Sequence, residues 1–311
     1  MKIDTIISKM LTQLSMIGIL GLASMAQAEV SVLTTVSDLN AIVQEVGGKE
    51  VKSESLCKGS QDPHYVEPKP SFMLKANKAD LMVSIGLGLE IGWLPSIIQG
   101  ARNPKIQPGQ PGFLEVGRSV TTLEVQNGKV TRAEGDVHPE GNPHITLDPI
   151  RAGELAQTIA KRLGEIDPPH AALYKSRADV LQKRLVDKTK GWGERISKTG
   201  VKQVVSFHKT LTYFFDRFNL QNPMILEPLP GVPPTAKHTM EVIERAKADK
   251  INLIMVENFF DATVANRIAK DVPGLRVEVV PVSVDGEEKI RSIDDLYEYL
   301  VSAIEGKAKH G

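Results

Sequence analysis

The sequence has little of several features that mark common protein classes. Its single cysteine, Cys57, excludes an intrachain disulfide and a zinc site built from several thiolates. Aromatic residues make up only 5% of the chain, and Lys+Arg and Asp+Glu are equal at 38 each, with no basic block. This composition argues against a protein that binds nucleic acid or an anionic membrane surface. No GxxxxGK[ST] segment occurs, so we do not expect this chain to hydrolyse ATP.

What is present is typical of a soluble globular protein. Of the 311 residues, 41% are hydrophobic and 24% are charged, which is close to the average for folded domains. A chain of this size can bury a sizeable core, and its length suits two domains or one large one.

The first 28 residues have the features of an export signal. Lys2 and Lys9 precede a mostly apolar run over 14–26, and the small-residue pattern Ala-Gln-Ala ends at Ala28. The run is shorter than the roughly 20 residues that a bilayer requires. We therefore predict a signal peptide over 1–28, cleaved after Ala28, and a mature protein in the periplasm. The alternatives are an N-terminal membrane anchor and a buried first helix. No cysteine lies near the cleavage site, so lipid attachment there is not expected.

The mature chain alternates short apolar runs with helical patterns. Near-continuous apolar, β-rich runs separated by helices are typical of parallel sheets covered on both faces. The sequence therefore predicts an α/β fold. The runs cover 30–33, 79–85, 204–207, 251–256 and 277–282.

One helical pattern, from Asp167 to Lys198, is longer than a crossover helix needs to be. Its apolar residues recur every three or four positions, which places them on one stripe of a single helix. We interpret it as a rigid helix joining two lobes, and the alternative is two shorter helices broken near Gly191. The predicted divisions are a signal peptide (1–28), an N-terminal lobe (29–160), a linking helix (161–199) and a C-terminal lobe (200–311). The stripe comprises Tyr174, Ala178, Leu181, Leu185, Thr189, Trp192 and Ile196.

Three of the seven histidines have surroundings that suggest metal ligation. His64 lies in the segment DPHYVEP (62–68), and His144 lies in NPHITLDP (142–149). His208 directly follows an apolar run, at the strand end where α/β sheets hold ligands. Neutral imidazole suits zinc and its neighbours in the first transition row. The other histidines carry no such context and are interpreted as solvated or core residues; they are His170, His238 and His310, with His138 considered below.

A fourth ligand is needed to close a tetrahedral site. Asp285 follows the last apolar run and precedes Gly286, so it also fits a simple turn. Glu257, at the end of the run INLIMV, is a competing carboxylate.

With these motifs, the sequence resembles the solute-binding proteins of zinc and manganese ABC transporters. The resemblance covers nearly all of the mature chain, through DPHYVEP, ADLMVSIGLGLE (79–90), NPHITLDP, FHKTLTYFFDRF (207–218) and residues 230–298. It implies two α/β lobes on a long helix, with the metal held in the cleft between them. It also implies the ligands: His64, His144, His208 and Asp285.

The sequence departs from the family pattern in two places. Asn142 and Thr146 stand where the family usually has Asp and Trp, and we expect the second change to alter packing rather than ligation. The loop over 126–141 replaces a long His-rich loop and carries only His138. We interpret His138 as a solvated loop residue, the alternative being an auxiliary metal contact. Cys57 is interpreted as a buried small residue, the alternative being a reactive thiol.

The donor types favour zinc as the bound metal. Three imidazoles and one carboxylate suit Zn²⁺, whereas manganese prefers more oxygen donors. Asp148 and Glu67 are candidate acceptors for the ring N–H groups of the ligands. Because ligating histidines must be neutral, we expect weaker binding below about pH 6.

The resemblance implies a protein that captures zinc as the transported solute and delivers it to ABC permease subunits. A periplasmic metallochaperone is a further candidate partner; nucleic acid is not, and we expect a monomer. We do not expect an enzyme: an exported zinc hydrolase would need an open water position, which a fourth ligand would close. The sequence also leaves open a manganese-binding member of the family, and a surface adhesin or metal chaperone without a permease.

Overall fold

The computed structural model describes residues 29–126, 138–229 and 231–308. The predicted signal peptide lies outside these ranges, as do most of the 126–141 loop and His310. Among the described residues, no helix is both long enough and apolar enough to cross a bilayer.

The first lobe is built on a four-stranded parallel sheet with the order β2-β1-β3-β4. The sheet consists of β1 (Val30–Thr34), β2 (Val51–Ser55), β3 (Leu81–Ser84) and β4 (Phe113–Glu115). Parallel neighbours require crossover connections, and helices supply them. These helices are α2 (Ser37–Gly47), α3 (Pro70–Lys78) and α4 (Leu94–Ala101).

The second lobe is likewise built on a parallel sheet, with three strands in the order β5-β6-β7. The α/β prediction is therefore confirmed, since the predicted apolar runs form strands of two parallel sheets. The strands are β5 (Val205–Ser206), β6 (Leu253–Glu257) and β7 (Arg276–Val280). The helices of this lobe are α7 (Thr212–Arg217), α8 (Ala236–Ala248), α9 (Thr263–Asp271) and α10 (Ile293–Glu305).

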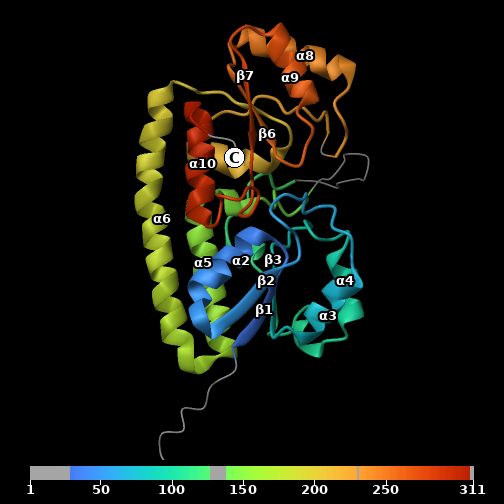
Figure 1. The fold of residues 1–311 in the computed structure, drawn as a ribbon, viewed down its shortest axis with the longest axis vertical. Helices are drawn as coiled ribbons and strands as arrows, with labels where there is room; N and C mark the ends of the chain where they lie inside the picture. Colours follow the sequence, from blue (N-terminus) through green and yellow to red (C-terminus); the bar gives the residue numbers. More distant parts are fainter. Residues whose placement is uncertain (1–28, 127–137, 230, 309–311) are drawn as a thin grey trace, which may run out of the picture.

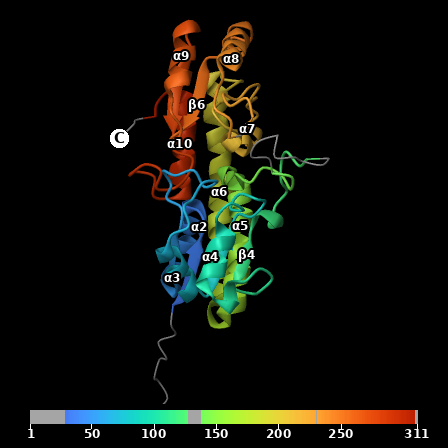
Figure 2. The same ribbon diagram turned by 90° about the vertical axis from the view of Figure 1, so that its right-hand side faces the viewer.

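Two consecutive helices, α5 (Pro149–Ile166) and α6 (Ala171–Thr199), follow the first lobe, separated by a short 3₁₀ turn at Pro168–His170. The α6 helix extends along one side of both lobes, as Figures 1 and 2 show. It is continuous through Gly191, which confirms the single long helix and contradicts a break there. The predicted linking segment, 161–199, contains the end of α5 as well as all of α6. The buried residues of α6 are six members of the predicted stripe: Tyr174, Ala178, Leu181, Leu185, Trp192 and Ile196.

The α6 helix is bonded to both lobes by arginines on its flank. Arg184 donates from Nη1 to Glu45 of α2 at 2.6 Å and from Nη2 to Asp294 of α10 at 2.8 Å. One guanidinium thus joins the two lobes through their helices. Arg195 binds α10 alone, through Glu298 and Glu305.

The lobes also meet directly near the end of β7. Gly59 of the first lobe packs so closely that an added Cβ would lie 2.0 Å from the carbonyl oxygen of Val284. Only glycine allows this approach of two backbones. The neighbouring Cys57 is buried, and burial raises the pKa of its thiol to about 12, as expected for a structural residue.

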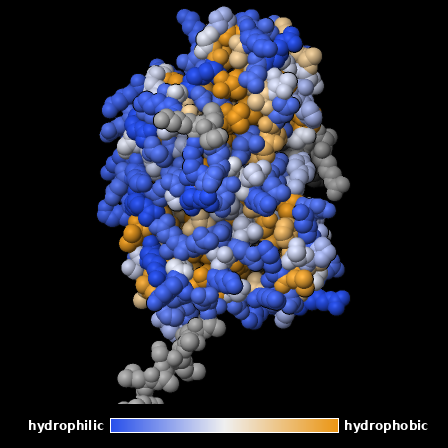
Figure 3. All heavy atoms as spheres, viewed as in Figure 1, coloured by the Kyte–Doolittle hydropathy of each residue, from blue (hydrophilic) through white to orange (hydrophobic). Residues whose placement is uncertain are grey.

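The face in Figure 3 is mostly hydrophilic, with separate apolar patches, several of them in the upper half, where Figure 1 places the second lobe.

Candidate metal centre

The structure brings His64, His144 and His208 together from segments far apart in the sequence. One ligand atom from each lies within 4.8 Å of the other two. The ring centroids of the three histidines are 5.3 to 5.5 Å apart. Imidazole rings on one tetrahedral zinc, with Zn–N bonds of about 2.0–2.1 Å, have centroids about 5 Å apart. The three rings therefore have the spacing of ligands on a common ion.

His64 and His144 are held by the same local structure, although they come from different segments. Asp62 Oδ1 accepts from the backbone N–H of His64 at 2.9 Å and from its ring Nδ1 at 2.7 Å. Asn142 Oδ1 does the same for His144, at 2.9 and 2.8 Å. The intervening proline restricts the backbone between acceptor and histidine. Each Asx-Pro-His segment therefore fixes its own histidine ring.

His208 reaches the site from the second lobe, just after β5. Its ring Nδ1 lies 2.6 Å from Oε2 of Glu227, a carboxylate that is almost completely buried. The backbone N–H of Glu227 donates to the carbonyl of Phe207 at 3.1 Å, which brings this glutamate beside the histidine. Glu227 was not anticipated from the sequence, because 19 residues separate it from His208.

These contacts decide which ring nitrogen can bind a metal. Carboxylate and amide oxygens accept hydrogen bonds, so each Nδ1 carries the proton. The Nε2 lone pair of each neutral ring is then available to a cation. An acceptor behind each ligating imidazole is the usual arrangement in metal sites.

The electrostatics of the site keep His144 neutral. Burial lowers its pKa well below 6.5, and the nearby His64, His208 and His138 lower it further. The neutral form is the one that ligates a metal.

The prediction that Asp148 and Glu67 accept hydrogen bonds from the rings of the ligands is wrong. Asp148 caps α5 through the N–H of Ile150 and pairs with Arg151 and Arg217. Glu67 is exposed. The acceptors in the structure are Asp62, Asn142 and Glu227. The sequence feature that could have identified Asp62 and Asn142 as acceptors is an Asx residue two positions before the histidine.

Neither proposed fourth ligand belongs to the group of three histidines. The side chain of Asp285 is about half exposed and lies 3.8 Å from Nη1 of Arg291. Glu257 is fully buried, and its carboxylate accepts from the backbone N–H of His208 at 3.3 Å. Burial raises the pKa of Glu257 to about 8, so the acid form predominates at neutral pH. The geometry of the described residues therefore does not assign Asp285 or Glu257 as a metal ligand.

The remaining histidines fall into two groups. His170 and His238 lie outside the site and bond to Asp167 and to the carbonyl of Ile225, which agrees with a structural role. His138, however, is in contact with His64, at 3.2 Å between the two Nε2 atoms. The interpretation of His138 as a solvated loop residue is therefore wrong.

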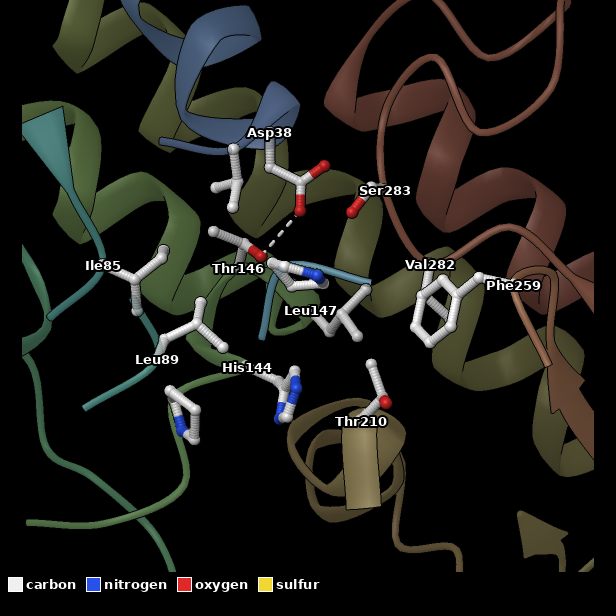
Figure 4. A pocket seen from close by; sticks show the side chains of 13 residues that line it. Asp38, Ile85, Leu89, His144, Thr146, Leu147, Thr210, Phe259, Val282 and Ser283 are labelled. Carbon is white, nitrogen blue, oxygen red and sulfur yellow. Dashed lines mark hydrogen bonds between the residues drawn. The ribbon is translucent and has the colours of Figure 1, made fainter. Parts of the chain in front are cut away.

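The three histidines lie between two hollows. One is a pocket of about 300 Å³ whose lining includes Asp62, His208, Glu227 and Phe260. The other, shown in Figure 4, is a cavity of about 30 Å³ beside His144, with Ile85 and Leu89 of the first lobe on one side and Val282 and Phe259 of the second on the other. The site therefore lies where the two lobes meet.

A buried carboxylate lines the smaller cavity and bonds to both lobes. Asp38 accepts from the Thr146 hydroxyl at 2.8 Å, drawn as the dashed line in Figure 4, and from the backbone N–H of Val284 at 2.7 Å. The adjacent Ser37 donates to the Val284 carbonyl at 2.6 Å. Burial raises the pKa of Asp38 to about 6. Thr146 thus takes part in the junction between the lobes.

The sequence was compared with protein families and with known proteins. Residues 32–305 match the model of a family described as zinc-uptake complex component A, periplasmic. The chain is 24% identical to the zinc-binding lipoprotein AdcA of Streptococcus pneumoniae over 82% of this chain and 50% of that protein. It is 26% identical to a manganese ABC transporter substrate-binding lipoprotein of Streptococcus gordonii, over 79% of this chain and 77% of that protein.

A solved structure shows the same fold. The crystal structure of a protein named ZnuA superimposes with a TM-score of 0.75 at 23% identity, over 90% of this chain and all of that one.

Proposed function

The chain belongs to the family of periplasmic zinc-uptake component A proteins, and from this premise we propose that it captures zinc and delivers it to an ABC transporter permease. It is a metal-binding, substrate-binding component of such a transporter, and this component is not an enzyme. The named relatives include a zinc-binding and a manganese-transporting protein, so the choice of zinc depends on the donors of this chain.

The observation that carries the proposal is the set of three imidazoles with fixed tautomers. One ligand atom each of His64, His144 and His208 lies within 4.8 Å of the other two, and no carboxylate belongs to this group among the described residues. Nitrogen donors suit Zn²⁺, whereas Mn²⁺ prefers oxygen donors. We therefore propose these three histidines as zinc ligands. The assignment of Asp285 as the fourth ligand stays a prediction.

The remaining parts of the proposal concern the whole chain. We propose export to the periplasm with cleavage after Ala28, and a monomer that docks on permease subunits. The lobe boundaries 29–160 and 200–311, and a metallochaperone as an additional partner, also stay predictions. The presence of ligands from both lobes supports a cycle in which zinc ties the lobes together before delivery.

Titration calorimetry of the metal-stripped mature protein tests the zinc assignment. We expect one tight zinc site that excess manganese does not displace. His208→Ala removes one nitrogen donor and should raise the zinc Kd on the order of 100-fold or more. His238→Ala, a histidine outside the site, should leave it unchanged. Manganese binding as tight as zinc binding would contradict the assignment.

A further inference from the structure

We infer that Asn142 is a positioning residue that joins two ligand-bearing segments of the site, one from each lobe. The inference rests on the proposed function, because it takes His144 and His208 as zinc ligands. It gives one side chain two tasks: it orients the ring of His144, and it holds the segment of His208 beside that ring.

The first observation is that the Asn142 amide uses both of its ends. The side chain is almost completely buried, and its Oδ1 accepts from the backbone N–H and the ring Nδ1 of His144. Its Nδ2 donates to the backbone carbonyl of Lys209 at 3.0 Å and to Oε2 of Glu124 at 2.9 Å. Lys209 directly follows His208 in the sequence. One amide therefore bonds to a ligand of the first lobe and to the residue next to a ligand of the second.

The neighbours of Asn142 fix the orientation of its amide. The backbone N–H of His144 can only donate, whereas the Lys209 carbonyl and the Glu124 carboxylate can only accept. The orientation with Oδ1 toward His144 satisfies all of these groups. A carboxylate at this position could keep the bonds to His144 but could not donate to Lys209. The bond between the lobes therefore depends on the amide nitrogen.

The backbone of Asn142 is also bonded to the second lobe. The hydroxyl of Tyr213, a buried residue of α7, donates to the Asn142 carbonyl at 2.7 Å and accepts from the backbone N–H of Leu123 at 3.0 Å. Lys209 pairs through Nζ with Oε1 of Glu124 at 3.0 Å. These bonds hold the start of the second lobe against the segment that carries His144.

The consequence is a site whose ligands are placed by bonds within the protein. The ring centroids of His144 and His208 are 5.5 Å apart, close to the spacing of about 5 Å for two imidazoles on one tetrahedral zinc. Segments that are held in advance lose less conformational freedom when a ligand binds. Asn142 therefore strengthens zinc binding by preorganisation, without contacting the metal itself.

Asn142→Asp tests the donor end of the amide, since a carboxylate keeps an acceptor for His144. We expect the zinc Kd of the full mature protein, measured by calorimetry, to rise at least about 10-fold because the bond to Lys209 is lost. If Asn142 served only as the acceptor behind His144, an ionised acceptor would keep or strengthen zinc binding. Wild-type or tighter binding in Asn142→Asp would therefore overturn the inference.

Asn103→Asp is the matched control. Asn103 also precedes a proline and is equally buried; its Oδ1 accepts from the N–H of Lys105, and its Nδ2 donates to the carbonyls of Ala76 and Ala79. This variant loses buried donor bonds of the same kind within the first lobe. Its stability in urea should fall while its zinc Kd stays at the wild-type value. Equal losses of zinc affinity in Asn103→Asp and Asn142→Asp would contradict a positioning role.

A second control concerns charge. Asn142→Asp places two carboxylates side by side, because Glu124 lies against the amide. The double variant Asn142→Asp/Glu124→Gln relieves this repulsion but still lacks the bond to Lys209, so its zinc Kd should stay well above that of Glu124→Gln alone. Equal zinc affinity in these two proteins would assign the loss to repulsion and contradict the inference.

Tyr213→Phe examines the same junction from the second lobe. It removes the hydroxyl that bonds to the Asn142 carbonyl and keeps the ring. We expect the zinc Kd to rise about 2- to 10-fold, as the loss of one buried hydrogen bond implies. An unchanged Kd in this variant would count against positioning by these bonds.

A double-mutant cycle with His208→Ala separates positioning from a general structural effect. Without the His208 ring, the placement of its segment no longer affects ligation, so Asn142→Asp should cause little further loss. The same fold-loss in both backgrounds would contradict the inference. Loss of tight binding in His208→Ala supports the proposed function whichever way Asn142→Asp behaves, whereas absence of tight zinc binding in the wild type would overturn both proposals.

Discussion

At the scale of single residues, the acceptor behind each histidine matters as much as the histidine itself. Asp62 and Asn142 are local, and their distance of two residues makes the ring orientation a property of the segment. Glu227 is brought to His208 by the second lobe, and it is buried at the wall of the larger pocket. An ionised acceptor fixes the ring and raises the basicity of the opposite nitrogen.

We expect Glu227→Ala to weaken zinc binding about 10- to 100-fold, because His208 loses the partner that fixes its tautomer. Competition with a chelator of known affinity measures the change. Glu241→Ala is a suitable control, since Glu241 pairs with His238 on α8, away from the site. Equal zinc affinity in Glu227→Ala and the wild type would show that the contact has no part in ligation.

At the scale of elements, α6 is the longest helix of the described chain, and Gly191 near its C-terminal end differs in role from Gly200 just past that end. Gly191 is exposed, and an added Cβ would meet nothing within 4 Å. Gly200, just past the last residue, has a φ of 73° and ends the helix in the left-handed conformation. Gly191 and Gly200 therefore have opposite roles: Gly191 weakens the helix, and Gly200 terminates it.

We expect Gly191→Ala to raise the free energy of unfolding by about 0.5–1 kcal/mol, because alanine restricts the unfolded chain and fits the helix. Gly200→Ala should lower it by about 1 kcal/mol, because a Cβ is unfavourable at positive φ. Urea unfolding of the metal-free protein measures both. The same sign of change in the two variants would contradict this account of α6.

At the scale of the whole molecule, three contacts illustrate how the lobes are held together without a metal. Arg184 joins α2 to α10 through α6, Gly59 lies against the 284–286 backbone, and Asp38 bonds to Thr146 and Val284. Asp38 is the titratable member of this set that has a raised pKa. Its ionisation is disfavoured in the folded state chiefly because burial removes water from the carboxylate.

The sign of the pH effect follows from that shift. Below the ordinary aspartate pKa of 3.8, Asp38 is protonated in both the folded and the unfolded protein. Between about pH 4 and about pH 6, Asp38 ionises only in the unfolded chain, and this ionisation favours unfolding. The contribution of Asp38 to stability should therefore fall by up to about 3 kcal/mol as the pH rises through this window, and then stay constant. Asp38→Asn should lack this component. Urea unfolding of both metal-free proteins from about pH 4 to about pH 7 tests it, and parallel stability curves would contradict it.

The sequence by itself determined the fold class, the long helix and the three histidines. Each of these depends on local patterns: apolar runs for parallel strands, a stripe at helical spacing for α6, Asx-Pro-His segments for His64 and His144, and a place just after an apolar run for His208. Such signals survive in a linear sequence because they need only neighbouring residues.

Only the tertiary structure decided which distant residues complete the site. His138 meets His64 across 74 positions, Glu227 meets His208 across 19, and Asp38 meets Val284 across 246. No pattern in the chain encodes these pairs, since they depend on how two lobes and a turn are packed. For the same reason, the place of Asp148 in its motif predicted an acceptor for a histidine ring, but in the folded protein Asp148 pairs with Arg151 and Arg217. A buried carboxylate needs such cationic partners to compensate for the loss of water.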